Sequence, residues 1–535
     1  MGEGRRGAVL GLERPTLDAL LPALVLVALS IPLILYGLGS YSLVNGDETL
    51  RLGVAEHMVE SGDWLRLDFK SDHRVYDTFM NAPLQYWARA LGIALFGSNL
   101  WTARIHSALF GVAAVLLTWR VALSVADRRS AFLAGLVLLT TLQFVYLHSA
   151  RTGEFETAIC LLLLLAAHLF QCSVERRGGF LAHHVCLALL LNLKLPLVLV
   201  PLLAEAAYFA VTPSARGRIL RWLGTGLVVA PFALSWHVVQ ALALPSEAGR
   251  VFATMFGLAG GLRTEAAGGP LENAGFYALV LLFGGHPWSF LYVPAVVFVL
   301  ARARDATERM RWRALSLTGL TVLVFFSCIR NRIAWYVLPA YPFLAIFVGR
   351  WLGDLLTRGP RRLELAALGV VAACLVFADA RTTSFHPFVH EAHLIPMQVR
   401  WRSVLGVEPL WGIPLVAAAS AAALLALQRA RGERFARAAA AVFTLGLAAL
   451  ALVRVAAPLR HLGYQSDLAR LHRDLAERRS AGLSIETPIE LPNAPLWVIR
   501  YYFADDFDVV VRPRPPGEPF NSRGGIFELV EKRPR

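Results

Sequence analysis

The chain has 535 residues, of which 56% are hydrophobic and 17% are charged, and its formal net charge is +14. A mean hydropathy of +0.53 excludes an ordinary soluble globular protein. The positive charge does not indicate nucleic-acid binding, because the basic residues lie mostly in short loops between apolar runs. The sequence therefore predicts a polytopic, all-α membrane protein.

The five cysteines indicate neither a disulfide framework nor a metal centre. All of them fall in or beside apolar runs without the spacing of either kind of site, so we interpret them as small buried residues. The chain also lacks the glycine-rich patterns that bind nucleotide phosphates after a strand. A nucleotide-binding site of this kind is therefore not expected.

Apolar runs long enough to cross a bilayer recur along the chain. With about 20 apolar residues per span, we count about 13 spans. Residues 181–211 allow either two short spans broken at residues 194–196 or one long bent span. The spans lie near residues 19–38, 103–123, 131–148, 157–173, 181–192, 195–211, 219–240, 284–301, 313–329, 334–350, 363–379, 411–428 and 437–456.

The loop charges predict the orientation. If the N-terminus is cytoplasmic, the short cytoplasmic loops hold more than twice as many Arg and Lys residues as the opposite short loops. An odd number of spans then places the C-terminal tail outside, with the first loop. Frequent Arg and Ala with few Lys is typical of a GC-rich bacterial genome, so we expect the inner membrane and a periplasmic tail.

The chain divides into a transmembrane catalytic domain, residues 1–457, and a small soluble tail domain, residues 458–535. For the tail we expect an α/β fold with a charged helix over residues 467–479. Three short strands are expected at residues 496–502, 508–512 and 525–530.

The first outer loop, residues 39–102, is expected to be structured. Apolar residues at helical spacing predict a helix over residues 48–60, with Asp47 or Thr49 as its cap. A second amphipathic helix begins at Pro83, which suits the first turn. Both helices are expected to lie along the membrane surface.

Polar groups recur at the outer ends of the spans. Ionisable groups at such places are costly, and their default interpretation is functional. The alternative is that they anchor the span ends and extend toward water. Five features on one side favour function: Asp47-Glu48, residues 151–156, Lys194, His286 and residues 330–332.

Several of these segments form a recognisable series. The first loop contains Asp47-Glu48-Thr49, Ser61-Gly62-Asp63-Trp64 and Ala82-Pro83-Leu84-Gln85-Tyr86-Trp87, and residues 327–342 contain Arg332, Tyr336 and Tyr341-Pro342. The series resembles the superfamily of protein O-mannosyltransferases and aminoarabinose transferases, GT-C glycosyltransferases that use polyprenyl-phosphate sugars. The resemblance implies the GT-C fold and covers most of the span region.

The resemblance also implies residue roles. Asp47 matches the aspartate that serves as general base, and Glu156 matches a second acidic residue; Glu48 is taken with them as catalytic. Lys194 and Arg332 match cations for the lipid phosphate. Arg51 and Arg151 are further candidates for the phosphate, and the expected substrate pocket contains Asn81, Gln85, Tyr86, His286 and Tyr336.

Two departures from the family pattern matter. Where aminoarabinose transferases read Glu-Lys-Pro-Pro, this chain reads Met80-Asn81-Ala82-Pro83, which puts an aminoarabinose donor in doubt. The family's arginine three residues after the catalytic aspartate is Leu50 here, with Arg51 one residue further on.

Elementary chemistry points to the same reaction. A lipid-phosphate leaving group needs nearby cations, and an acceptor hydroxyl needs a base. We expect an inverting glycosyltransferase acting on a lipid, glycan or protein acceptor, without an obligatory cofactor and with no metal ligands assigned, although a divalent metal is possible. The alternatives are a flippase or transporter for a lipid-linked sugar and a degenerate protein that binds such a lipid without catalysis.

Overall fold

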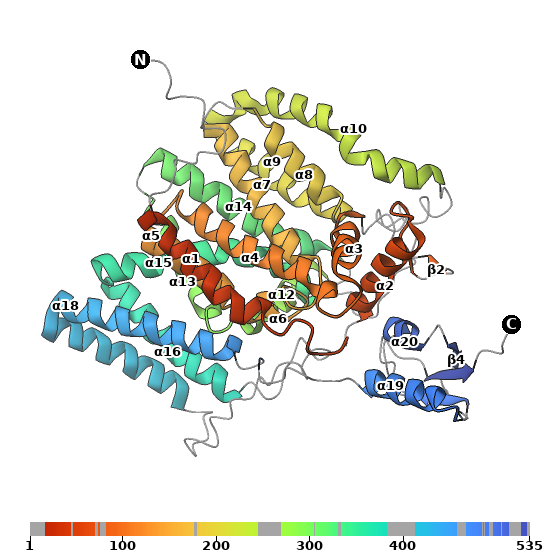
Figure 1. Ribbon diagram of the computed structural model, residues 1–535. Helices are drawn as coiled ribbons and strands as arrows, with labels where there is room; N and C mark the ends of the chain where they lie inside the picture. The colour runs from red at the N-terminus through yellow and green to blue at the C-terminus, as the bar shows by residue number, and fades with distance from the viewer. Residues whose placement is uncertain are drawn as a thin grey trace.

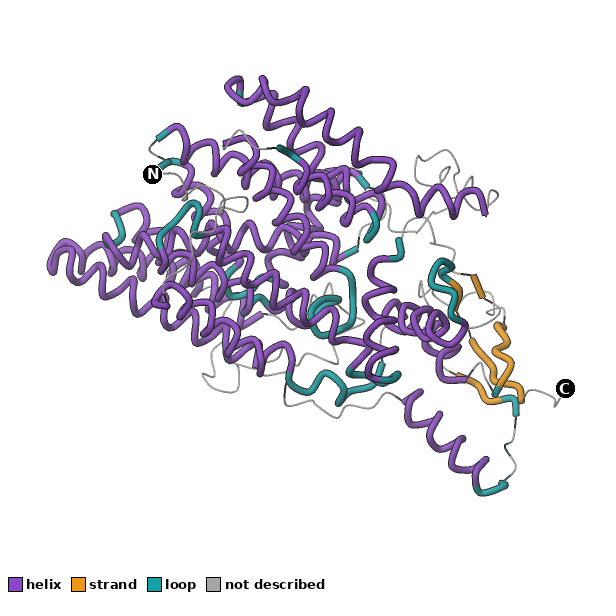
Figure 2. Tube along the Cα trace, turned by 45° about the horizontal axis from the view of Figure 1, so that its top comes forward, coloured by secondary structure: helices purple, strands orange, loops and turns teal. Residues whose placement is uncertain are grey.

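The computed structural model describes residues 17–43, 46–69, 73–74, 82–175, 179–243, 269–303, 305–329, 333–381, 412–456, 459, 467–483, 485, 487–491, 496–503, 506–512 and 526–531. Within these residues the chain forms an elongated bundle of helices with a small α/β unit at one end (Figures 1 and 2). The predicted fold class, an all-α membrane protein with a small C-terminal α/β unit, is confirmed.

Both halves of the chain contribute helices to the bundle. The first half contains α1 (Leu17–Ser30), η1 (Ile31–Leu35), α4 (Thr102–Ala122), α5 (Arg128–Leu139), α6 (Leu142–Tyr146), α7 (Glu156–Glu175), α8 (Leu181–Leu191), η2 (Leu195–Val198), α9 (Leu199–Val211), η3 (Pro213–Arg218) and α10 (Ile219–Ala243). The second half contains α12 (Pro270–Gly284), α13 (Ser289–Leu300), α14 (Ala306–Cys328), η4 (Ala334–Ala340), α15 (Tyr341–Arg358), α16 (Arg362–Arg381) and α18 (Gly412–Ala456).

By length and apolar composition, four of the described helices can cross a membrane, and the pair α12–α13, bent by 107°, adds a fifth. The count of about 13 spans therefore stays a prediction. Many bundle helices are shorter than the spans expected from the sequence.

One of the expected spans is broken, and the ambiguous region of residues 181–211 forms two helices. The span expected at residues 131–148 ends as a helix at Leu139, where the hydroxyls of Thr140 and Thr141 donate to carbonyls one turn back, and α6 follows. The region of residues 181–211 forms two helices, α8 and α9, on either side of the turn that contains Lys194. Pro196 has no N–H to continue a helix through this turn.

The first outer loop folds into two helices and a hairpin beside the bundle. They are α2 (Gly46–Ser61), β1 (Asp68–Phe69), β2 (His73–Arg74) and α3 (Leu84–Phe96). Both helices were expected, and Pro83 is the N-cap of α3. The capping prediction is wrong, because α2 begins at Gly46 and so places both Asp47 and Thr49 inside its first turn.

The tail contains α19 (Asp467–Ser480), β3 (Ile489–Leu491), α20 (Leu496–Phe503), β4 (Phe507–Arg512) and β5 (Ile526–Glu531). The strands form an antiparallel sheet in the order β3-β5-β4, with Val509 opposite Leu529. The strand expected at residues 496–502 is a helix instead. Ile499 and Phe503, four residues apart, are both buried in the core of the tail, which is the spacing of one helical face.

The tail packs against the first loop. Helix α20 contacts α2, and the hydroxyl of Tyr501 donates to Oε1 of Glu56 at 3.1 Å. The first loop and the tail therefore lie on the same side of the bundle (Figure 1).

Candidate active site

Asp47 lies in the first turn of α2, and 41% of its side chain is exposed. Its Oδ2 atom is 3.3 Å from Nε2 of His148 and 3.7 Å from Nη2 of Arg51. Two cationic or hydrogen-bonding groups therefore hold one carboxylate oxygen while the side chain remains accessible. This is the arrangement that a general base needs.

Glu48, predicted to be catalytic beside Asp47, has a different environment. Its side chain is buried, and both of its oxygens accept from Arg104, at 2.6 Å from Nε and 3.1 Å from Nη2. The same guanidinium also donates to the backbone carbonyls of Leu38 and Tyr41. The pair Glu48–Arg104 ties the first loop to α4, so Glu48 positions the helix that carries Asp47.

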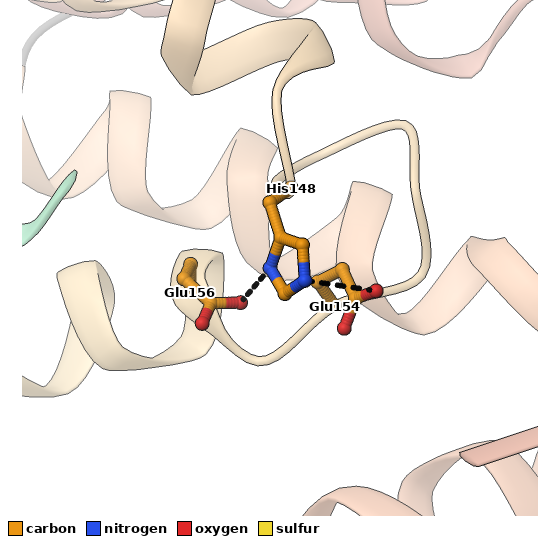
Figure 3. A group of neighbouring side chains, drawn as sticks. All are labelled: His148, Glu154 and Glu156. Atoms are coloured by element: carbon orange, nitrogen blue, oxygen red, sulfur yellow. Dashed lines mark ion pairs between the residues drawn. The ribbon is translucent and has the colours of Figure 1, made fainter. Parts of the chain in front are cut away.

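His148 is the centre of the site and lies in the loop between α6 and α7 (Figure 3). Its Nε2 atom is 3.4 Å from Oε1 of Glu154, and its Nδ1 atom is 3.2 Å from Oε2 of Glu156. With Asp47, three carboxylates face this one imidazole. All of His148 is buried, and its ring stacks on Trp335 with centroids 3.7 Å apart and planes 4° apart.

The backbone around His148 is unusual. His148 has φ of 57°, a left-handed conformation that costs free energy for a residue with a side chain. Gly153, in the same loop, has φ of 66°, and a Cβ there would lie 2.7 Å from the carbonyl oxygen of Ala103. Arg89 clamps this turn by donating to the carbonyls of Gly153 and, at 3.1 Å, Glu48. The loop is thus held in place by groups from the first loop and α4.

Two cations flank the carboxylates. Arg51 forms an ion pair with Glu154 and lies over the ring of Phe155, 3.8 Å from its centroid. Nζ of Lys194 is 6.0 Å from the same ring and 4.8 Å from that of Tyr336. Both cations therefore lie near the ring of Phe155, and Lys194 brings positive charge from the α8–η2 turn to the site.

Other predicted residues have other places. Nη1 of Arg151 donates to the carbonyls of Leu33 and Ile34, at 3.3 and 3.1 Å, and so holds η1. The role of Arg151 as a phosphate ligand stays a prediction. His286 is buried in the turn between α12 and α13, with its ring 6.1 Å from that of Phe290. Asn81 and Arg332 lie outside the described residues.

The first helical turn of α3 contributes two buried side chains. The ring of Tyr86 meets the edge of Phe155, with centroids 6.4 Å apart. Gln85 is buried, and among the described residues neither atom of its amide has a hydrogen-bond partner. A buried amide without a partner is costly, which fits a group that a substrate hydroxyl satisfies. Both residues stay predicted pocket residues.

The sequence interpretation missed His148 and gave Glu154 no role. The signal was present, since His148 is an ionisable residue at the end of an apolar run and Glu154 precedes Glu156 by two residues. Neither residue matched a motif of its own.

The cluster could hold a metal ion. One ligand atom each from His148, Glu154 and Glu156 lie within 4.8 Å of one another, the one such group among the residues that the structure describes. Imidazole and carboxylate ligands suit Zn²⁺ and other divalent metals. Arg51, however, already neutralises Glu154, so a metal would have to displace it.

Comparisons with known proteins place this site in context. Residues 80–236 match the family described as dolichyl-phosphate-mannose-protein mannosyltransferase. The crystal structure of ArnT from Cupriavidus metallidurans superimposes with a TM-score of 0.61 at 21% identity, over 90% of this chain and 83% of that one, and shows the same fold.

An undecaprenyl phosphate-alpha-4-amino-4-deoxy-L-arabinose arabinosyl transferase of Pseudomonas fluorescens is 28% identical over 64% of this chain. The chain is therefore similar to GT-C glycosyltransferases of the superfamily that contains ArnT and the protein mannosyltransferases. The match spans 63% of the Pseudomonas transferase, slightly under two thirds of its length. An uncharacterized protein of Aquifex aeolicus is 26% identical over 70% of this chain and 71% of its own length.

The shared fold and the apolar helices indicate a multi-pass membrane protein. The GT-C fold places Asp47, the loop of His148 and the turn of Lys194 together although about 150 residues separate the first from the last along the sequence.

Proposed function

We propose that this GT-C protein transfers a sugar from a polyprenyl-phosphate donor to a hydroxyl of a lipid, glycan or protein acceptor. The observation that carries the proposal is the accessible Asp47 carboxylate held by His148 and Arg51, with Lys194 nearby. One crystal structure of the Cupriavidus ArnT is described as bound to undecaprenyl phosphate, and it matches this fold with a TM-score of 0.61. That description supports a lipid-phosphate donor.

The proposed step is a single inverting displacement. The acceptor oxygen attacks the anomeric carbon while the bond from that carbon to the phosphate oxygen breaks. The lipid phosphate leaves with the electron pair, and Asp47 takes the hydroxyl proton. Lys194 stabilises the charge that develops on the phosphate, and Arg332 is proposed to assist.

His148 is proposed to keep Asp47 in place and to connect it with Glu156. One ring nitrogen faces Asp47 and the other faces Glu156, so a proton taken up by Asp47 can be shared along this line. The carboxylates of Glu154 and Glu156 in turn fix the imidazole, as the third group does in hydrolase triads.

We propose that no metal is obligatory, because Arg51 and His148 already supply positive charge to the three carboxylates. Transfer measured after exhaustive treatment with a chelator is expected to match that of the untreated enzyme. Loss of transfer that Mn²⁺ or Mg²⁺ restores would instead assign His148, Glu154 and Glu156 as metal ligands.

The reaction is proposed at the outer face of the bacterial cytoplasmic membrane, with a cytoplasmic N-terminus and a periplasmic tail. The loop charges support this orientation. The contact between Tyr501 and Glu56 supports a common side for the tail and the first loop.

The test is transfer of radiolabelled sugar from a panel of polyprenyl-phosphate sugars to membrane acceptors. We expect Asp47→Asn to lower transfer about 10²- to 10⁴-fold, because the amide cannot accept the proton. Asp63→Asn is the matched control, since Asp63 is 43% exposed and lies 3.7 Å from Arg66, much as Asp47 is 41% exposed and lies 3.7 Å from Arg51.

Equal loss in both variants would contradict the assignment of Asp47 as the base. If the wild type binds a donor but transfers nothing, the flippase and the degenerate binding protein become the better accounts.

A further inference from the structure

A cavity lies between the first loop and the tail, away from the catalytic cluster. It is a cleft of about 810 Å³ whose walls include Glu56 and Glu60 of α2 and Arg473, Tyr502 and Asp506 of the tail. Ligand pockets of small molecules typically measure about 300–1,000 Å³. The cleft is therefore large enough to hold a ligand of several rings.

The cleft is on the side of α2 opposite Asp47. Glu56 follows Asp47 by nine residues, which is two and a half turns and about 14 Å along the helix axis. A ligand in the cleft would thus touch the same helix as the catalytic carboxylate without occupying its place. Because Ser42, five residues before Asp47, also lines the cleft, the cleft reaches toward the start of the helix that carries Asp47.

The walls of the cleft are fixed by contacts between the two units. Glu56 accepts from the hydroxyls of Tyr501, at 3.1 Å, and Ser98. Burial raises the pKa of the Tyr501 hydroxyl, and Glu56 raises it further, so Tyr501 keeps the proton that it donates. His472 packs beside Tyr502 with ring centroids 5.5 Å apart. A cleft with walls fixed in this way loses little conformational entropy when it binds a ligand.

The chemistry of the lining excludes several ligands. It contains the carboxylates of Glu56, Glu60 and Asp506 against the guanidinium of Arg473, and Arg479 forms an ion pair with Asp506, so that one negative charge remains in excess. A phosphorylated or otherwise anionic ligand would meet this excess negative charge unfavourably. An acyl chain would remove the charged side chains of Glu60 and Arg473 from water without offering them a partner. Hydroxyl and amine donors, by contrast, form strong charge-assisted hydrogen bonds with carboxylates.

We propose that this cleft binds a neutral or amine-bearing saccharide of the acceptor, at a subsite remote from the hydroxyl that reacts. The proposal rests on the glycosyl transfer proposed above and narrows its acceptor to a glycan or glycolipid. Contacts with a remote part of the acceptor supply binding energy that positions the reacting hydroxyl near Asp47.

Ser61 and Ser480 provide a matched pair of variants for the test. Each is an exposed serine at the last position of its helix, and each hydroxyl donates to a carbonyl within its own helix, that of His57 for Ser61 and that of Glu477 for Ser480. Ser61 lines the cleft, whereas Ser480 is not among the described lining residues. Ser61→Trp therefore fills the cleft, and Ser480→Trp adds the same ring elsewhere on the surface.

Binding is measured by calorimetry on the full chain in detergent, with three probes: maltotriose as a neutral ligand, the chitosan trimer as an amine-bearing ligand and trigalacturonic acid as an anionic ligand. We expect the wild type and Ser480→Trp to bind the first two probes alike and Ser61→Trp to bind them at least about tenfold more weakly. Binding of trigalacturonic acid is expected to be the weakest.

The proposal is overturned if neither uncharged nor amine-bearing probe binds, if trigalacturonic acid binds as well as they do, or if both tryptophan variants behave alike. Binding of undecaprenyl phosphate is measured in parallel on the three proteins and is expected to be equal. If the wild type does not bind undecaprenyl phosphate, the proposed transfer fails, whatever the saccharides do, so the two failures are distinguishable.

Discussion

Helix α7 has a histidine–carboxylate pair near each of its ends, and the two pairs are built differently. At its start, Glu156 meets His148, which also faces Asp47 and Glu154. Toward its other end, Phe170 packs against His183, whose Nε2 atom is 3.2 Å from Oε2 of Glu205.

The pair of His183 and Glu205 has the features of a structural contact. His183 lies in the regular helix α8, and its Nδ1 atom is 3.1 Å from the carbonyl oxygen of Ala166. The Glu205 carboxylate also accepts from Nε1 of Trp222 at 2.8 Å. Both histidine nitrogens have a partner, and aromatic rings surround the pair.

The group around His148 carries more charge than packing requires. Three carboxylates converge on His148, its backbone is left-handed, and Asp47 is partly open to solvent. Strain and concentrated charge cost stability, and they persist where function uses them. The difference teaches that a buried histidine in a membrane protein is informative through the charges and strain around it, not through burial alone.

Replacing His148 is expected to have the largest effect on sugar transfer. His148→Gln keeps a polar side chain but removes the imidazole that joins Asp47 to Glu156, and we expect transfer to fall about 10²-fold. The measurement is kcat for sugar transfer, with KM for the donor expected to change little. A variant that loses donor affinity but keeps kcat would show that His148 serves binding.

Lys194→Ala is expected to have the next largest effect. The variant removes the cation that lies 4.8 Å from the Tyr336 ring, and we expect transfer to fall about tenfold or more through weaker stabilisation of the leaving phosphate. Lys194→Arg keeps the charge and is expected to retain most of the activity. If Lys194→Arg is as poor as Lys194→Ala, charge is not what Lys194 supplies.

Replacing His183 is expected to have the smallest effect on sugar transfer. His183→Gln leaves Glu205 with Trp222 as a partner, so we expect a loss of about 1 kcal/mol in stability, typical of polar contacts between membrane helices. Thermal unfolding in detergent measures it, and transfer per folded molecule is expected to match the wild type. A large loss of kcat in a well-folded His183→Gln would remove the contrast between the two pairs.

Hydropathy and the first-loop motifs identified the class of protein and both amphipathic helices of the first loop. Asp47 and Lys194 could be chosen from the sequence, because a charged group at the end of an apolar run needs a reason to be there. Which charged groups meet could not be read from the sequence. Arg151 has the same apparent setting as Lys194 but turns to the carbonyls of η1.

Two further differences between what the sequence suggested and what the structure shows have the same physical origin. Glu48 and Asp47 are neighbours in sequence, yet successive residues on a helix point about 100° apart, so one meets Arg104 and the other meets His148. In the tail, the apolar residues of 496–503 fit a strand by composition, and packing against the sheet decides for a helix.

The measurement that tests the account most directly is a double-mutant cycle of Asp47→Asn and His148→Gln in the sugar-transfer assay. If the two residues act as one unit, the double variant is expected to transfer sugar at about the rate of Asp47→Asn alone, because the imidazole has nothing left to position. If the losses of the two single variants instead multiply in the double variant, His148 and Asp47 act independently, and the central claim is contradicted.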